Sequence, residues 1–155
     1  SPQQALGKIL VGMLTLTEFE LASERLGVPL DSGDQEDEHS CFSDNTHNDF
    51  IYNALGIENV YFGRYSEYQG VGLDELVRDL DPGLDEKMKS AISESISLLR
   101  GIEAPFDQVL ASPPGNAQRL DAELAFDALM RQGRLIKEVG FVFGLDIHSN
   151  DGSPG

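Results

Sequence analysis

The chain has 155 residues and is 40% hydrophobic, which suits one domain with a sizeable core. Its 27 acidic side chains against 11 Lys and Arg give a net charge of -16, so its surface repels nucleic-acid phosphates and anionic lipid headgroups. One cysteine, Cys41, excludes an internal disulfide framework. No run approaches the roughly 20 apolar residues of a membrane span, and the start, SPQQALGK, has no basic n-region. We therefore expect neither a nucleic-acid partner nor a membrane span.

Apolar residues recur every three to four positions over residues 4–26, which predicts a first amphipathic helix. Gly27 and Pro29 are expected to end it, since both residues disfavour a continuing helix. Residues 30–45 are rich in acids and weak helix formers. This composition predicts a structured loop or a short helical turn.

A second helix is expected to begin near Asn45 or Thr46, because an apolar periodic run follows these residues. Asp44 or Thr46 is expected to be its N-cap, since both side chains can accept a hydrogen bond from a free backbone N–H. Gly70 and Gly72 are expected to mark its end.

The rest of the chain divides into a helical turn at 73–80, a third long helix, a short helix at 104–111, a break at 112–116 and a last helix at 117–147. Asp81 and Pro82 form a favourable N-cap and N1 pair for the third helix. Four long helices joined by polar segments, without a convincing run of period two, predict an all-α fold. We expect residues 1–155 to form a single helical domain like a four-helix bundle, with short extra helices in the connections.

The segment EDEHSCFSDNTHND, residues 36–49, holds five acids and two of the three histidines. Carboxylates and imidazoles bind divalent or ferric ions, and a cation relieves the repulsion among crowded acids. The candidate ligands are Glu36, Glu38, His39, Asp44, His47 and Asp49. Their spacing fits neither H-E-x-x-H nor a calcium loop. The alternative is a polar turn in which Ser43, Asp44 and Thr46 cap the helix and the histidines bond to backbone.

Tyr61, Tyr65 and Tyr68 are spaced to share one face of the predicted second helix, with Arg64 beside them. Phenolates bind ferric iron, and a tyrosine row can stack on a flat ligand such as haem. The same row also fits the amphipathic rim of a core. The residues themselves leave both interpretations open.

Residues 35–65, QEDEHSCFSDNTHNDFIYNALGIENVYFGRY, resemble the imelysin family, also called peptidase M75 or iron-regulated protein A-like. SCFSDNTH followed by NALGI and VYFG carries the match. Members are bacterial cell-envelope proteins associated with iron uptake. The resemblance is to their C-terminal half, and it implies a fold of two helical-bundle halves with the proposed site between them. It also implies a periplasmic or cell-envelope location and a bound metal ion, iron or zinc.

The family's G-x-H-x-x-E motif belongs to the N-terminal half and is absent here. The resemblance therefore implies a C-terminal bundle that forms one wall of a metal or iron-related site, completed by an N-terminal half in the same protein or a second chain. The alternatives are a metallopeptidase half-domain active only with that partner, and a non-catalytic helical interaction module. The residues that match the motif of the family's C-terminal half are Ser43, Asp44, Thr46, His47 and Asp49. With the patterns above, we expect metal ligands at His39, Asp44, His47 and Asp49, and binding residues at Ser43, Thr46, Tyr61 and Arg64.

Overall fold

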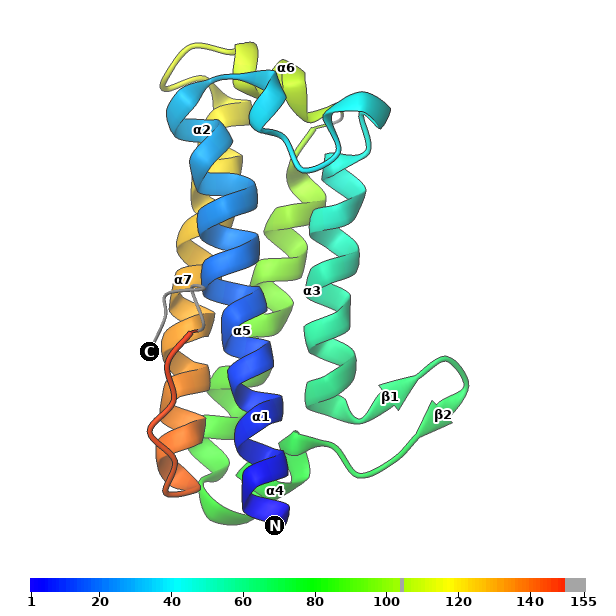
Figure 1. Ribbon diagram of the computed structural model, residues 1–155, viewed down its shortest axis with the longest axis vertical. Helices are drawn as coiled ribbons and strands as arrows, with labels where there is room; N and C mark the ends of the chain where they lie inside the picture. Colours follow the sequence, from blue (N-terminus) through cyan, green and yellow to red (C-terminus); the bar gives the residue numbers. More distant parts are fainter. Residues whose placement is uncertain (104, 150–155) are drawn as a thin grey trace.

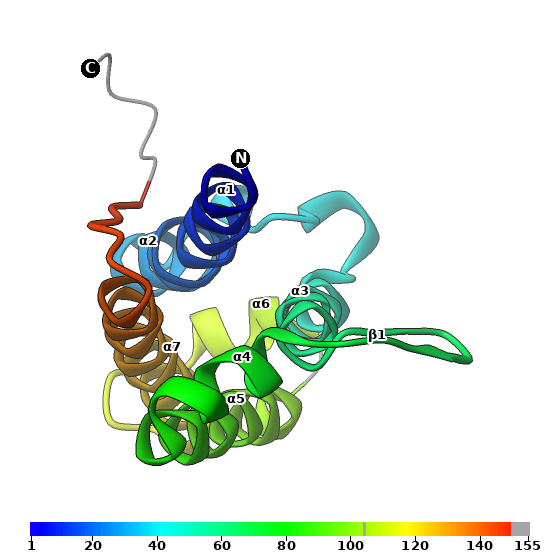
Figure 2. The ribbon, with the colours of Figure 1, turned by 90° about the horizontal axis from the view of Figure 1, so that it is seen from below.

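The protein folds into a bundle of long helical rods, shown by a computed structural model that describes residues 1–103 and 105–149 (Figures 1 and 2). The first rod runs without a break through α1 (Pro2–Leu14), the π-helix η1 (Thr15–Gly27) and α2 (Val28–Ser32), and the others are α3 (Thr46–Phe62), α5 (Pro82–Gly101) and α7 (Ala117–Val142). The connections contain the 3-10 helices η2 (Gln35–Asp37) and η3 (Cys41–Ser43), the strands β1 (Arg64–Tyr65) and β2 (Tyr68–Gln69), and the helices α4 (Leu73–Leu80) and α6 (Phe106–Ala111). The predicted all-α bundle with short helices in its connections is confirmed.

The rods surround one hydrophobic core. α7 packs on α5 and η1, and α3 packs on α5 and η1. Figure 1 shows the segment between α2 and α3 at one end of the bundle, and Figure 2 shows it bridging the first rod and α3. Within the described part of the chain, every helix is too short or too polar to cross a membrane.

The first rod does not end at Gly27 and Pro29, so that prediction is wrong. Pro29 lies in the first turn of α2, directly after the π-helix, and the helical backbone continues through it. The rod ends at Gly33, whose left-handed backbone (φ 67°) lets its N–H donate to the Pro29 carbonyl at 2.8 Å.

The middle of this rod is a π-helix of 13 residues, an arrangement that usually appears as a single turn and often at functional sites. It brings together groups of residues that are five positions apart. Arg25 contacts Glu20 at 3.2 Å, and the Ser23 hydroxyl donates to the Glu18 carbonyl at 2.8 Å. Such pairs do not meet on an α-helix, where neighbours are three or four residues apart.

The prediction that Asp44 or Thr46 caps α3 is wrong. The N-cap is Asn45, whose side chain makes no capping hydrogen bond. Thr46 is already inside the helix and buried, and its hydroxyl accepts the Ser40 N–H at 3.2 Å. Asp44 takes the left-handed conformation (φ 49°) that turns the chain into the helix.

α3 ends at Phe62 rather than at Gly70 and Gly72, because Gly63 is left-handed (φ 63°). A Cβ at Gly63 would lie 2.8 Å from the Val71 carbonyl, so the backbone returns directly over this glycine. Between them β1 and β2 pair antiparallel, with Tyr65 opposite Tyr68, in a hairpin that projects from the bundle (Figure 1).

The predicted tyrosine row therefore does not exist on one helix face. Tyr65 and Tyr68 are exposed on the hairpin, whereas Tyr61 is 1% exposed in the core. The Tyr61 hydroxyl donates to Asp85 Oδ1 at 3.0 Å, and Lys89 donates to Asp85 Oδ2 at 2.7 Å. Burial, and then the bond and charge of Asp85, raise the pKa of Tyr61. This network ties α3 to α5.

The third helix starts as predicted, since Asp81 Oδ1 accepts the Leu84 N–H at 3.0 Å. The last helix ends at Val142 and not at residue 147, because Gly144 adopts a left-handed backbone (φ 72°). The chain then folds back along α7 (Figure 1), and Ile147 covers Gly140, where a Cβ would lie 2.9 Å from it.

Candidate functional site

The predicted site segment folds over one end of the bundle and brings two of its residues together. His39 Nδ1 lies 2.9 Å from Asp49 Oδ2, an ion pair when the imidazole is protonated. The Ser40 hydroxyl donates to the same carboxylate oxygen. His39 comes from the loop and Asp49 from the first turn of α3, so this contact fastens the loop to the helix.

The surroundings hold the Asp49 carboxylate in its charged form. Partial burial acts to raise its pKa, but the hydrogen bonds from Ser40 and His39, with the charges of His39 and Arg25, lower the pKa below its ordinary value of 3.8. Asp49 therefore stays an anion through the neutral range and keeps His39 oriented.

Beside this pair, Glu38 is a buried carboxylate, 6% exposed. Burial raises its pKa, a hydrogen bond with Thr46 opposes this, and the charges of Asp107 and Asp44 raise the pKa further. Glu38 Oε1 has no hydrogen-bond partner among the described residues. A buried oxygen without a partner is costly, so Glu38 retains unused capacity to bind a donor or a cation.

His47, in the first turn of α3, also has a buried polar atom without a described partner. Its Nδ1 is buried and has no hydrogen-bond partner in the part of the chain that the structure describes. Glu36, Ser43 and Asp44 are exposed. Within residues 1–103 and 105–149, no three His, Cys, Asp or Glu side chains gather closely enough to hold a metal ion. Of the four expected ligands, the structure joins only His39 and Asp49.

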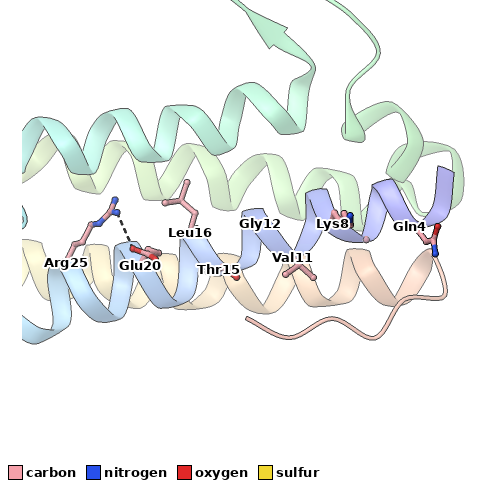
Figure 3. A pocket seen from close by; sticks show the side chains of 9 residues that line it. Gln4, Lys8, Val11, Gly12, Thr15, Leu16, Glu20 and Arg25 are labelled. Atoms are coloured by element: carbon pink, nitrogen blue, oxygen red, sulfur yellow. Dashed lines mark hydrogen bonds and ion pairs between the residues drawn. The ribbon is translucent and has the colours of Figure 1, made fainter. Parts of the chain in front are cut away.

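A cavity of about 410 Å³ lies in front of His39, between the loop and η1. Its lining residues are Phe19, Glu20, Glu24, Arg25, Asp37 and His39. The Glu20–Arg25 pair forms its border with a larger trough of about 870 Å³ along the first rod, since both residues line both hollows. Figure 3 shows this trough and the ion pair at its end.

Sequence reasoning missed Glu20 and Arg25 as site residues. They are five positions apart, a spacing that has no meaning on an α-helix, and only the π-helix places them side by side. Arg64, an expected binding residue, instead lies on β1 with its guanidinium carbon 4.6 Å from the centre of the Phe62 ring. Tyr61 faces the core, away from any described cavity.

Fold and site together define an all-helical bundle domain with a histidine–carboxylate pair at one end. The chain belongs to the imelysin family, whose sequence profile (Imelysin, the peptidase M75 family) matches residues 1–136. This confirms the resemblance seen in residues 35–65.

Two longer proteins resemble the chain. It is 30% identical over 126 residues to iron-regulated protein A of Synechococcus elongatus, a match that covers 81% of this chain and 35% of the relative. Its fold resembles the crystal structure of an imelysin peptidase from Bacteroides ovatus, with a TM-score of 0.77 and 19% identity over 95% of this chain and 44% of that one. The chain thus spans less than half the length of either protein.

Proposed function

We propose that this chain forms one wall of a metal-binding, iron-related site in an imelysin protein of the cell envelope, and that the remaining wall comes from the part of the fold that the chain does not span. The observation that carries the proposal is the His39–Asp49 pair, whose histidine lines a cavity, together with Glu38 Oε1 and His47 Nδ1, two buried polar atoms of the same segment that have no hydrogen-bond partner among the described residues.

The donor set by itself does not fit a metal ion. Nitrogen and oxygen ligands of the right type are present, but His39 and Asp49 supply only two of the three or more that a stable site needs. The described residues would therefore orient ligands and hold negative charge, while further donors come from a second surface. A neutral imidazole fixed by a carboxylate is a common arrangement for a ligand of this kind.

The iron-related part of the proposal rests on the relative. Iron-regulated protein A is named for its response to iron, and the matched region covers most of this chain. The cell-envelope location is likewise proposed from the family resemblance. The net charge of -16 is compatible with a cationic ligand, since negative potential raises the local concentration of cations.

The test uses a chimera in which this chain replaces the matched region of iron-regulated protein A. Calorimetric titration with ferric, ferrous and zinc ions is expected to show stoichiometric binding by the chimera and none by the chain alone. His39→Ala and Asp49→Asn are each expected to weaken binding at least about tenfold, as loss of a ligand or of its orienting partner does.

A matched control is His148→Ala, because this histidine is exposed on the C-terminal segment and pairs only with Asp146 among the described residues. It should bind metal as the unchanged chimera does. Metal binding that survives both His39→Ala and Asp49→Asn would refute the proposal.

A further inference from the structure

A further cavity, the α5–α7 cavity, lies between these two helices and has a volume of about 440 Å³. The helices pack against each other and run in opposite directions along the bundle (Figures 1 and 2). On each helix the lining residues recur at steps of three and four positions, so each helix presents one continuous face to the cavity. The α5–α7 cavity shares no lining residue with the cavity at His39, and its volume is typical of a small-molecule site.

Basic side chains are concentrated around the α5–α7 cavity. Lys87, Arg131 and Arg134 all line it, and all three are exposed. They are three of its eight lining residues, whereas the whole chain has only 11 Lys and Arg among 155 residues. The cavity is therefore a local exception on a protein whose net charge is -16.

Two of these three cations have no anionic partner. Arg131 donates to Glu94 Oε1 at 2.9 Å, and this contact links the two helices. Lys87 and Arg134 form no hydrogen bond or ion pair with any residue that the structure describes. The second acidic residue of the lining, Glu138, also has no ion-pair partner among the described residues. Three cations against two carboxylates leave the lining with one net positive charge.

The chemistry of these side chains favours a ligand that carries negative charge on oxygen atoms. The guanidinium of Arg134 is a planar fork of N–H donors that matches two oxygens of a carboxylate, and the ammonium of Lys87 adds a compact positive charge. Ser90, exposed three positions after Lys87, supplies a hydroxyl donor on the same face of α5. Distant acids oppose such a ligand little, because the Debye length is about 8 Å at physiological ionic strength.

We propose that the α5–α7 cavity binds a small di- or tricarboxylate. Arg134 and Lys87 bind two of its carboxylate groups, and its carbon chain packs on buried Ala91 and half-buried Leu135, which also line the cavity. A monocarboxylate leaves one of the two unpaired cations without a partner, and inorganic phosphate has no carbon chain to cover the apolar part of the lining. The proposal does not depend on the metal site, because none of these residues lines the cavity at His39.

Calorimetric titration of the chain with citrate, succinate, acetate and inorganic phosphate tests the proposal. Citrate and succinate are expected to bind with one ligand per chain. Acetate should bind at least about tenfold more weakly, because a single carboxylate engages only one of the two cations. Lys87→Gln and Arg134→Gln should each weaken citrate binding at least about tenfold. Arg134→Lys should recover only part of that loss, since it restores the charge but not the planar fork.

The matched control is the double variant Lys8→Gln/Arg100→Gln. It removes two exposed cations that form no ion pair with any described residue and that do not line this cavity. Its net charge equals that of Lys87→Gln/Arg134→Gln, yet it should bind citrate as the wild type does. Glu138→Gln should tighten citrate binding, because it removes a carboxylate that competes with the ligand for the same cations.

Melting temperatures equal to that of the wild type show that the variants are folded, as expected for exposed side chains. The inference is overturned if the chain shows no saturable binding of citrate, if Lys87→Gln/Arg134→Gln binds citrate as the wild type does, or if the control variant loses as much affinity. Tighter binding of phosphate than of citrate also overturns it. Weaker binding by Glu138→Gln does so too, because Glu138 then contacts a positive group of the ligand.

Discussion

Replacing Tyr61 by Phe should destabilise the fold without changing its shape. The substitution removes only the hydroxyl that donates to Asp85 Oδ1 at 3.0 Å, in a place where Asp85 is fully buried. Lys89 still contacts Asp85 Oδ2, but Asp85 Oδ1 loses the hydroxyl that donates to it. A hydrogen bond to a charged group contributes roughly 1.5–3 kcal/mol, and the more apolar Phe recovers part of this, so we expect a loss of about 2 kcal/mol.

Urea denaturation followed by circular dichroism measures this loss, with an unchanged slope expected because the folded state is the same. The melting temperature should fall by about 4–8 °C for a domain of this size. Tyr65→Phe is the matched control, since Tyr65 is 77% exposed on the hairpin and its hydroxyl has no described hydrogen-bond partner. A Tyr61→Phe variant within about 0.5 kcal/mol of the wild type would refute the assignment of Tyr61 to a structural network.

Three further predictions follow from single residues. Glu38→Gln should raise the melting temperature at pH 7, because the raised pKa of Glu38 means that its charged form destabilises the folded state. The gain should fade as the pH falls, since the wild-type carboxyl then becomes protonated in both the folded and the unfolded protein. Asp49→Asn should lower the free energy of unfolding at pH 7 but change it little in strong acid, because the pKa of Asp49 in the folded protein lies below its ordinary value of 3.8. The stabilisation by the Asp49 carboxylate is fully present above pH 3.8 and is lost as the pH falls through the lower pKa of the folded state. Urea denaturation at pH 7 and in strong acid measures this, and the same loss at both pH values would contradict it. Gly63→Ala should cost more than Gly33→Ala, for which about 1 kcal/mol is expected, because both glycines are left-handed but only at Gly63 would a Cβ meet backbone, 2.8 Å from Val71; equal losses in chemical denaturation would argue against this.

The helix starts show what local sequence can and cannot predict. Asp81 before Pro82 caps α5 as expected, because both the cap and the N–H that it accepts lie within three residues. At α3 the same rules favoured Asp44 or Thr46, yet the hydroxyl of Thr46 is engaged by the Ser40 N–H and buried under the folded loop. A contact from outside the helix decided which residue became the cap.

The candidate site divides in a similar way. Residue types in the 36–49 segment predicted a polar site, and the structure joins His39 to Asp49 within it. Spacing alone could not tell that Asp44 would be exposed on a turn, or that His47 would bury a ring nitrogen for which the described residues offer no hydrogen-bond partner. These outcomes depend on how the loop crosses from the first rod to α3.

By itself, the sequence determined that this protein is an acidic all-helical bundle of the imelysin type, because hydrophobic periodicity and the SCFSDNTH motif are local properties of the chain. Only the tertiary structure decided that the middle of the first rod is a π-helix and that the rod continues past Gly27 as α2, that Glu20 meets Arg25, and that the hairpin replaces the end of the second helix. The physical reason is packing. A helix keeps an irregular turn, or ends at a particular glycine, when contacts with distant segments such as Val71 outweigh the small differences in local propensity.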